Sequence, residues 1–389
     1  MSRPEAGGPA RAAVLVAPGH YEVRSYPVPP PPLGGAILAV ELAGICGTDK
    51  HVWQGHLDQY GGTAAPRRIR LPLIQGHEIV GRIAAMGSAL RDFEGHPVRE
   101  GDRVVVAPNI PCGTCRACRS GAPYTLCERT EDYGNTLSAA DPPHLLGGWA
   151  EAMVVLPGSI FFLVPDELPS DVAVLAELMA VTVGLDRLRQ GAGFPHEPFG
   201  LDDSVVVYGV GPLGLCHVMK ARMMGAGTIV AVDLSATRLE MARRLGADVT
   251  LDASVTTHEQ RLEAVRAATN GAGADVVVEC AGVPEVVPLG LDMVRPGGAF
   301  IEAGNYSDLG EVAISPHRHL LSKGIHLLGV AGEEPGAYLP ALRQLARYRE
   351  RYPVDELTKE RFGLAATDAA MRRSLAPESF KVLVDPARA

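Results

Sequence analysis

The sequence has no apolar run long enough to span a bilayer. Its hydrophobic stretches are all interrupted before the ~20 consecutive apolar residues that a membrane helix needs. The amino terminus, residues 1–9, also lacks the basic segment and long apolar run of a secretion signal. We therefore expect no membrane partner and a cytoplasmic location.

An excess of basic residues is missing as well. The 36 lysines and arginines are outnumbered by 45 aspartates and glutamates, which gives a formal net charge of −9. Proteins that bind nucleic acids broadly need a positive surface to displace counterions from the phosphates. We therefore expect no nucleic-acid partner.

Internal repeats, low-complexity tracts and long linkers are absent too. At 389 residues the chain exceeds the usual size of one domain, so two closely joined units are expected. In the first part, short β-rich runs at 13–16, 36–40 and 103–106 are separated by glycine and proline clusters. This pattern predicts an irregular, mainly antiparallel β domain.

From about residue 180 the pattern changes to apolar strands that alternate with amphipathic helices. Strands that are apolar on both faces and joined by helices form parallel, doubly wound (Rossmann) α/β sheets. After Glu334 only a helix (338–348) and a strand (380–384) remain, too little for a third domain. We expect a β domain at 1–179, completed by 336–389, and a Rossmann domain at 180–335. The elements expected in the latter are strands 204–208, 228–232, 275–279, 299–302 and 325–330, and helices 213–224 and 236–245.

A glycine motif lies between the first of these strands and its helix. Gly209, Gly211 and Gly214 form G-x-G-x-x-G, which allows a tight turn, close approach of a pyrophosphate and close helix packing. Asp233 ends the next strand, where a carboxylate can bind a ribose 2′-hydroxyl. The same carboxylate repels a 2′-phosphate, so NAD is favoured over NADP. Arg238, close by in sequence, complicates this preference unless it is an ordinary solvated helix charge.

Cysteine is scarce and unevenly distributed. There are seven in all, an odd number, and four of them form C-x2-C-x2-C-x8-C in a loop rich in glycine and proline: Cys112, Cys115, Cys118 and Cys127. Such spacing lets one segment wrap four sulfurs around a tetrahedral ion, and four thiolates leave no open position. We predict a structural zinc in a reducing compartment. A redox role for the thiols is the alternative.

A second metal site is indicated by Cys46 and His77. A catalytic zinc takes sulfur, nitrogen or carboxylate ligands and keeps one position open for water or substrate. Taken alone, the pair could also be a small buried cysteine and a hydrogen-bonded core histidine.

Six motifs occur in one order along the chain. They are residues 44–49 (GICGTD), 76–81 (GHEIVG), 101–104 (GDRV), the four-cysteine loop, 147–151 (GGWAE) and the glycine motif. Together they resemble the zinc-dependent medium-chain alcohol dehydrogenase family over nearly the full chain, which implies a GroES-like β domain together with the Rossmann domain. The four-cysteine loop departs from the family in having one extra residue before Cys127.

The resemblance implies roles for single residues of the metal site. Cys46 and His77 match ligands of the catalytic zinc, and Glu177 falls where the family places a third ligand. Glu78 matches a carboxylate that lies beside the zinc or binds it in some relatives. The resemblance leaves open which glutamate completes the shell.

Three further residues match the catalytic machinery of the family. Thr48 matches the hydroxyl that bonds the substrate oxygen, His51 the end of a proton relay, and Asp49 a residue that supports the ligands. Apart from the resemblance, the position of Lys381 suggests that it approaches the cofactor phosphates, with a solvent-facing lysine at a strand as an equal alternative.

The function expected is the reversible oxidation of an alcohol by zinc and NAD. Glutamate as third ligand resembles the polyol and threonine dehydrogenase branches, which favours a secondary or polyhydroxylated alcohol. A double-bond reductase of the same fold and a non-catalytic NAD-binding protein are the alternatives. The family also suggests a homodimer or homotetramer. Arg67, Arg68 and Arg70 either attract a substrate carboxylate or phosphate or form a solvated face.

Overall fold

A computed structural model describes residues 4–58, 68–190 and 199–388 of the chain. The chain divides into two compact units. Unit 1 comprises Met1–Glu177, Glu334–Arg349 and Val354–Ala389, and unit 2 comprises Leu178–Glu333 and Glu350–Pro353. Across the described ranges, no helix has both the length and the apolar character needed to cross a membrane.

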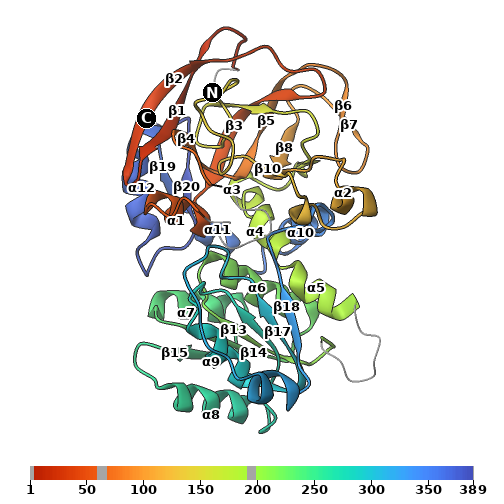
Figure 1. Cartoon of the computed structure of the whole chain (residues 1–389), viewed down its shortest axis with the longest axis vertical. Coiled ribbons are helices and arrows are strands. Elements are labelled where there is room, and N and C mark those ends of the chain that lie inside the picture. The colour runs from red at the N-terminus through yellow and green to blue at the C-terminus, as the bar shows by residue number, and fades with distance from the viewer. Residues whose placement is uncertain (1–3, 59–67, 191–198, 389) are drawn as a thin grey trace. The chain divides into compact units, whose positions relative to one another are not determined.

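Unit 1 is built around a seven-stranded sheet in which β3 is central (Figure 1). The strand order is β12-β8-β5-β3-β20-β19, with β11 also paired to β3, and all pairs except β19 with β20 are antiparallel. The strands are β3 (Ala36–Gly44), β5 (Glu78–Met86), β8 (Arg103–Val106), β11 (Ala152–Val155), β12 (Phe161–Leu163), β19 (Glu360–Phe362) and β20 (Val382–Val384).

The core of unit 1 explains the stability of this sheet. Strand β3 is buried along nearly its whole length because small and branched apolar residues face both sides. A smaller sheet, β2-β1-β4, packs its apolar residues into the same cluster, which also includes the fully buried Trp149. Its strands are β1 (Pro9–Ala17), β2 (His20–Pro27) and β4 (Leu73–Ile74).

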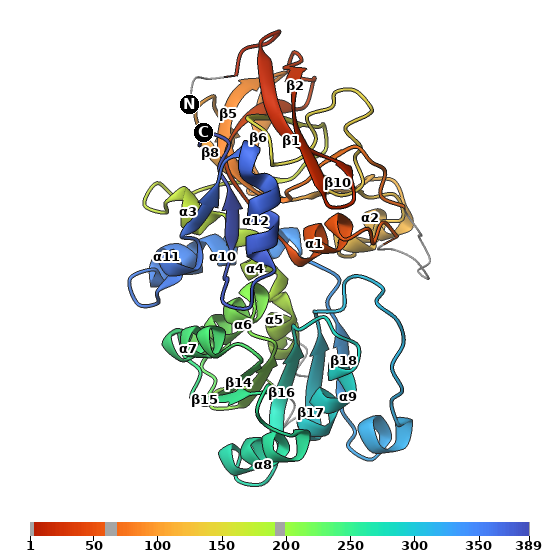
Figure 2. The ribbon, with the colours of Figure 1, turned by 90° about the vertical axis from the view of Figure 1, so that its left-hand side faces the viewer.

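The carboxyl-terminal segment belongs to unit 1. Strand β20 pairs antiparallel with the end of β3, with Leu383 opposite Gly44. Helix α12 (Thr367–Ser374) packs beside β19 and β20 (Figure 2). Helix α10 (Pro335–Tyr348) stacks the ring of Tyr338 on that of Phe162. Leu383 and Gly44, 339 positions apart in sequence, are thereby placed opposite each other.

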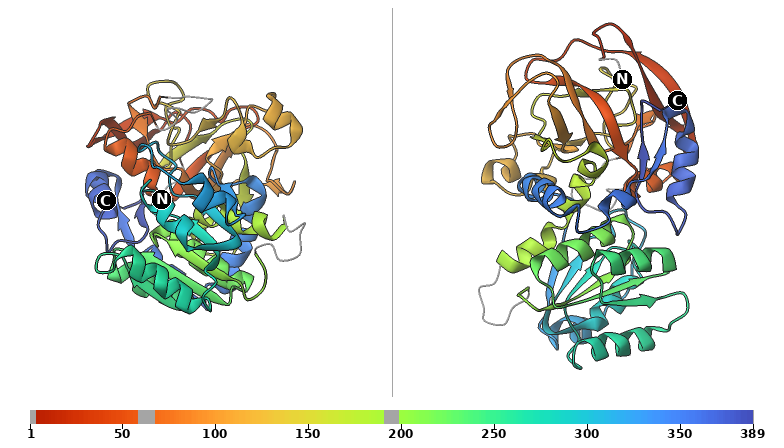
Figure 3. Two further views of the ribbon diagram at one scale, coloured as in Figure 1. Left: turned by 60° about the horizontal axis from the view of Figure 1, so that its bottom comes forward. Right: turned by 180° about the vertical axis from the view of Figure 1, so that it is seen from behind.

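Unit 2 is a six-stranded, all-parallel sheet of order β15-β14-β13-β16-β17-β18. This confirms the predicted doubly wound α/β fold. Helices α6 and α7 pack together at one face, and α8 and α9 at the other (Figures 1 and 3). The strands are β13 (Ser204–Tyr208), β14 (Thr228–Asp233), β15 (Val249–Asp252), β16 (Ala274–Glu279), β17 (Val294–Glu302) and β18 (His326–Gly329), and the helices α6 (Pro212–Met224), α7 (Ala236–Leu245), α8 (His258–Ala268) and α9 (Val286–Met293).

Two carboxyl groups lie side by side at the ends of β16 and β17. Glu279 and Glu302 are paired in register, and Asn305 Nδ2 donates to both, at 3.2 and 3.1 Å. Glu279 also accepts the amide hydrogens of Ala281 and Gly282, at 2.6 and 3.0 Å. Burial, together with the charge of Glu302, raises the pKa of Glu279 to about 8. The pair therefore retains a proton near neutrality.

We predict that Glu279→Gln weakens the pH dependence of folding stability between pH 5 and 9. Because the pKa of Glu279 is higher in the folded than in the unfolded chain, its contribution is present at low pH and is lost as pH rises through about 8. The slope removed is at most about 1.4 kcal/mol per pH unit. Urea unfolding followed by circular dichroism at several pH values measures it. Glu263→Gln, on the exposed side of α8, is the control and should keep the wild-type slope.

Candidate functional site

The first half of the candidate metal site is positioned by the pairing of β3 with β5. Gly44, the last residue of β3, lies opposite Glu78, the first residue of β5. Cys46 follows β3 by two residues and His77 immediately precedes β5, so this register brings both side chains to one place. A Cβ on Gly44 would lie 1.7 Å from Glu78 Oε2, so any larger residue there would displace the Glu78 carboxylate.

Three potential ligands meet at this point. The Sγ of Cys46, a ring nitrogen of His77 and a carboxylate oxygen of Glu78 all lie within 4.8 Å of one another. His77 and Glu78 are buried, and Oε2 of Glu78 has no hydrogen-bond partner among the described residues. Sulfur, imidazole nitrogen and carboxylate oxygen are the donors that zinc prefers, so these residues fit the metal that the sequence implies.

The electrostatics of the cluster favour the metal-binding form of the cysteine. Burial by itself would raise the pKa of the Cys46 thiol, but the charge of His77 and a hydrogen bond from it lower the pKa below its usual value. Burial likewise opposes charge on His77, yet Asp49 and Cys46 raise its pKa. The thiolate is therefore available, and a metal must displace a proton from the imidazole.

Helix α1 (Gly47–Trp53) carries the residues expected to handle protons. Asp49 Oδ2 accepts the amide hydrogen of Cys46 at 2.9 Å, which fixes the start of the helix. Thr48 Oγ1 lies 3.3 Å from Nε2 of His77, and His51 is one turn further along the same helix. Burial, with the charges of His56 and Lys50, lowers the pKa of His51. A neutral His51 can accept a proton from its surroundings.

Glu177 lies in the first turn of α4 (Ala176–Val181) and is buried. Its negative charge contributes to raising the pKa of both His77 and Lys381, although burial and nearer charges act more strongly on each. It is therefore near the cluster. Glu78, however, is the carboxylate that shares the 4.8 Å neighbourhood of Cys46 and His77.

The position of Lys381 in the sequence suggested contact with the cofactor phosphates. In the structure its ammonium group contacts Glu78. It is 2% exposed, and its Nζ donates to Glu78 Oε1 at 2.5 Å and to the carbonyl oxygen of Ile45 at 3.0 Å. Burial, the largest single influence, would lower the pKa of Lys381, but the charges of Glu78 and Cys46 and the hydrogen bond to Glu78 together raise it. The ammonium balances the carboxylate behind the metal cluster. Sequence pattern could not show this, because the two residues are 303 positions apart.

The four-cysteine loop brings its sulfurs together as predicted from their spacing. All four lie within 4.8 Å of one another, and none of the seven cysteines is in a disulfide. Backbone amides of Cys115 and Cys118 donate to the sulfurs of Cys112 and Cys115, at 3.4 and 3.5 Å. Hydrogen bonds from Thr114, backbone and side chain, lower the pKa of Cys112 to about 5. The loop is thus preorganised for a cation that four thiolates can surround.

The glycine motif in unit 2 has the geometry of a phosphate-binding turn. A Cβ on Gly214 would lie 1.9 Å from the carbonyl oxygen of Gly209, so the helix can approach the strand only with glycine there. Gly211 is the N-cap of α6, whose first turn exposes amide hydrogens. Asp233 accepts the amide hydrogens of Val210 (2.7 Å) and Ser235 (2.9 Å), which ties it to the turn.

The arginines singled out in the sequence lie in other surroundings. Arg238 lies in the first turn of α7, where its amide donates to Ser235 Oγ at 3.3 Å. Arg70 pairs with Asp141, Arg68 is exposed, and Arg67 lies outside the described residues. The charge of Arg70 is therefore partly neutralised within the chain.

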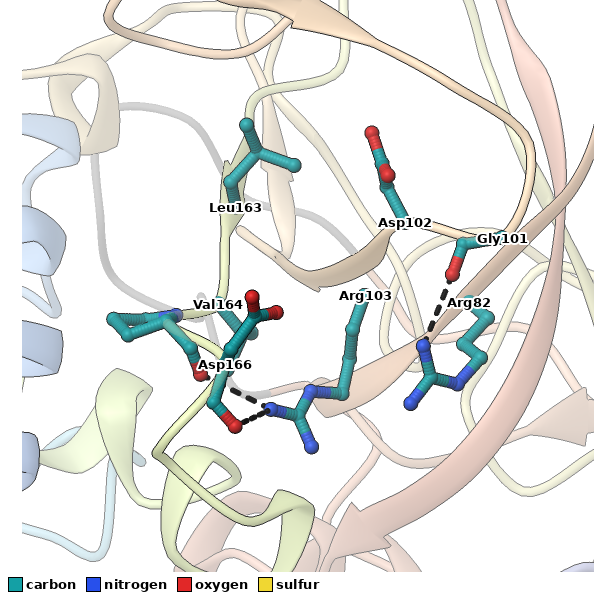
Figure 4. Close-up of a pocket in the computed structure, with 8 residues that line it drawn as sticks. Arg82, Gly101, Asp102, Arg103, Leu163, Val164 and Asp166 are labelled. Atoms are coloured by element: carbon teal, nitrogen blue, oxygen red, sulfur yellow. Dashed lines mark hydrogen bonds between the residues drawn. The ribbon is translucent and has the colours of Figure 1, made fainter.

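Unit 1 also contains a cavity of about 450 Å³ that shares no residue with the metal cluster (Figure 4). The two arginines that line this cavity form hydrogen bonds and an ion pair with other residues of the protein. Arg103 donates to the carbonyl oxygens of Pro165 and Asp166, and Arg82 donates to that of Gly101 at 3.0 Å and pairs with Glu41. These contacts indicate a structural role for the guanidinium groups.

Comparison with known proteins agrees with both units. Residues 33–166 match the alcohol dehydrogenase GroES-like domain, and residues 212–347 match the zinc-binding dehydrogenase family. The chain is 35% identical to 5-exo-hydroxycamphor dehydrogenase of Pseudomonas putida, over 97% of this chain and 98% of that protein. It is 30% identical to sorbitol dehydrogenase of Bacillus subtilis over the same shares. The crystal structure of an alcohol dehydrogenase from Thermotoga maritima superposes with a TM-score of 0.86 and 26% identity, covering 97% of this chain and 100% of that one.

The chain therefore belongs to the zinc-dependent medium-chain alcohol dehydrogenase family. It is an enzyme, an alcohol dehydrogenase that interconverts an alcohol and its carbonyl compound with zinc and NAD(H). This decides against the double-bond reductase and the non-catalytic NAD-binding protein.

We predict that Lys381→Met destabilises the zinc-free protein by about 3–5 kcal/mol, because it leaves the Glu78 carboxylate buried without its counter-charge. Urea unfolding followed by tryptophan fluorescence measures the loss, since Trp53 and Trp149 both lie in unit 1. The double variant with Glu78→Met should recover most of it. The exposed Lys359→Met is the control, and an equal loss in that variant would contradict the assignment.

Proposed function

We propose that Cys46, His77 and Glu78 are the protein ligands of the catalytic zinc, with Glu177 beside them. The proximity of the three ligand atoms supports the choice of Glu78. Lys381 holds the other oxygen of Glu78, so the carboxylate stays oriented when its neighbours change charge. In the same scheme, the four cysteines of the loop hold the structural zinc and Lys381 is a positioning residue, not a phosphate ligand.

The chemistry requires that an alcohol lose a proton and a hydride. When bound, zinc stabilises negative charge on the substrate oxygen, and NAD accepts the hydride. We propose that Thr48 takes part in the proton path through its hydroxyl and that His51 passes the proton onward. The lowered pKa of His51 supports this role, because a neutral imidazole is the form that accepts a proton. Asp49 holds His77 and the start of α1 in place.

The substrate class we propose is a secondary or polyhydroxylated alcohol. The two named relatives act, by their names, on hydroxycamphor and sorbitol. Hydroxycamphor carries its hydroxyl on a ring carbon, and sorbitol carries several secondary hydroxyls. The secondary carbinol carbon is therefore the chemistry common to both, and we extend it to this chain.

We further propose a homodimer or homotetramer formed through the edge of the sheet in unit 2. Strand β18 is the last strand in the described sheet order, and its Leu327 side chain is 54% exposed. An exposed edge with apolar side chains is a template for pairing with a second copy.

We also propose a cytoplasmic location. The reducing environment that four clustered thiolates require supports it.

The function is tested by following NADH formation over a panel of primary, secondary and polyhydroxylated alcohols. We expect secondary alcohols or polyols to exceed simple primary alcohols by about 10-fold or more in kcat/KM. Cys46→Ser should abolish turnover while leaving the zinc of the four-cysteine loop in place. Cys216→Ala, outside both cysteine clusters, should retain activity. Turnover by the Cys46→Ser variant at the wild-type rate would refute the proposed zinc site.

The cofactor preference is tested with Asp233→Asn. The asparagine keeps one oxygen to accept the hydrogen of Val210, loses the acceptor that serves Ser235, and no longer repels a 2′-phosphate. We expect the ratio of kcat/KM for NADP to that for NAD to rise by about 10-fold, equivalent to about 1.4 kcal/mol. Asp252→Asn is the matched control, because Asp252 ends the neighbouring strand in register with Asp233. An unchanged ratio in Asp233→Asn would remove Asp233 as the discriminating residue.

A further inference from the structure

A chain of buried polar groups extends from the proposed zinc site into the core of unit 1. Gln75, fully buried just after β4, donates from Nε2 to Asp49 Oδ1 and to the Asp49 carbonyl oxygen, both at 3.2 Å. Its Oε1 accepts a hydrogen bond from the hydroxyl of Tyr21 on β2. The other carboxylate oxygen of Asp49, Oδ2, accepts the amide hydrogen of Cys46, and Oδ1 lies 3.7 Å from Nδ1 of His77. The groups therefore run in the order Tyr21, Gln75, Asp49, His77.

The direction of each hydrogen bond in this chain is fixed by the chemistry of its groups. An ionised carboxylate only accepts, so Gln75 must turn its NH₂ group towards Asp49 and its carbonyl oxygen towards Tyr21. The phenol then has to donate. If the amide turned over, its carbonyl oxygen would face the carboxylate and its NH₂ group would face the phenol. The Tyr21 hydroxyl thus selects the one amide orientation that supports Asp49.

Tyr21 and Gln75 are both held in place by their surroundings. The Tyr21 ring is 7% exposed and lies 5.6 Å, centroid to centroid, from the ring of the buried Trp149. The backbone carbonyl oxygen of Gln75 accepts the backbone amide hydrogen of Trp149 at 3.0 Å. A rigid support is needed because a ligating histidine is oriented by the group that accepts from its other ring nitrogen.

We infer that Tyr21 and Gln75 are positioning residues for the proposed zinc site. They hold the Asp49 carboxylate so that it faces Nδ1 of His77 and leaves Nε2, the nitrogen near Thr48, directed to the metal. The inference rests on the proposed function, since it requires His77 to be a ligand. It adds two residues that no motif in the sequence marks and gives their order of action: Tyr21 acts through Gln75, and Gln75 through Asp49.

The test is the affinity of the purified protein for zinc, measured by competition with a chromophoric chelator. Tyr21→Phe, which removes one hydroxyl, and Gln75→Met, which removes the amide, should each weaken the more labile of the two zinc sites by about 10-fold. The double variant should be no weaker than Gln75→Met alone, because a residue that acts only through Gln75 has no effect once Gln75 is replaced. The zinc of the four-cysteine loop should be unaffected in every variant.

Tyr133→Phe is the matched control. Tyr133 is another buried tyrosine of unit 1, and its hydroxyl bonds Ser159 at 2.7 Å and the amide of Leu156 at 2.6 Å, away from the metal cluster. It should lose folding stability without losing zinc affinity. An equal fall in zinc affinity for Tyr133→Phe and Tyr21→Phe would show a general structural effect and overturn the inference. So would unchanged affinity in Tyr21→Phe and Gln75→Met, or additive losses in the double variant.

The Cys46→Ser variant separates this inference from the proposed function. If it binds one zinc fewer than the wild-type protein, the catalytic site is real and the tyrosine and glutamine variants test the inference alone. If it binds as much zinc as the wild-type protein, the proposed ligand set fails, and the inference fails with it. Far-ultraviolet circular dichroism of each variant confirms that the fold is retained.

Discussion

The antiparallel pairing of β3 with β5 is the constraint on which the candidate site depends. Placing Gly44 opposite Glu78 brings the residues just beyond each strand end, Cys46 and His77, to one point. A slip of one residue would reverse the faces of every side chain in β5 and bury the wrong ones. Because β20 pairs with the same end of β3, the register also delivers Lys381 to Glu78. One register therefore sets both the ligands and the counter-charge behind them.

The cost of burying charge shapes the surroundings of this cluster. A thiolate, an imidazole and carboxylates lie together in a region from which water is largely excluded, and such charges are stable only when each is paired or hydrogen-bonded. Lys381 balances Glu78, while the Cys46 amide and Gln75 satisfy Asp49. The supporting residues lie on or directly next to strands β2, β4, β5 and β20 and helix α1 of unit 1. This is the physical basis for assigning a metal site to these residues.

In unit 2, the arrangement of charges and amide hydrogens suits an anionic cofactor. Parallel strands end at one edge of the sheet, and there the glycine turn exposes amide hydrogens while Asp233 adds a negative charge. Further along the same sheet, Glu279 lies beside Glu302 with its pKa raised to about 8, so the pair retains a proton near neutrality. The edge is thus kept from accumulating negative charge near neutrality, which suits a cofactor that is itself anionic.

Local patterns in the sequence determined much of this protein. The strand and helix series of unit 2, the glycine motif and the four-cysteine loop all depend on residues close together in the chain, so spacing alone predicted them. Resemblance to the family supplied Cys46, His77, Glu78, Glu177, Thr48 and His51. Only the tertiary structure decided that Lys381 faces Glu78 and that Tyr21 and Gln75 lie behind Asp49. These contacts join residues 26 to 303 positions apart through sheet pairing and side-chain packing, and no periodicity within a segment records which distant segment it will meet.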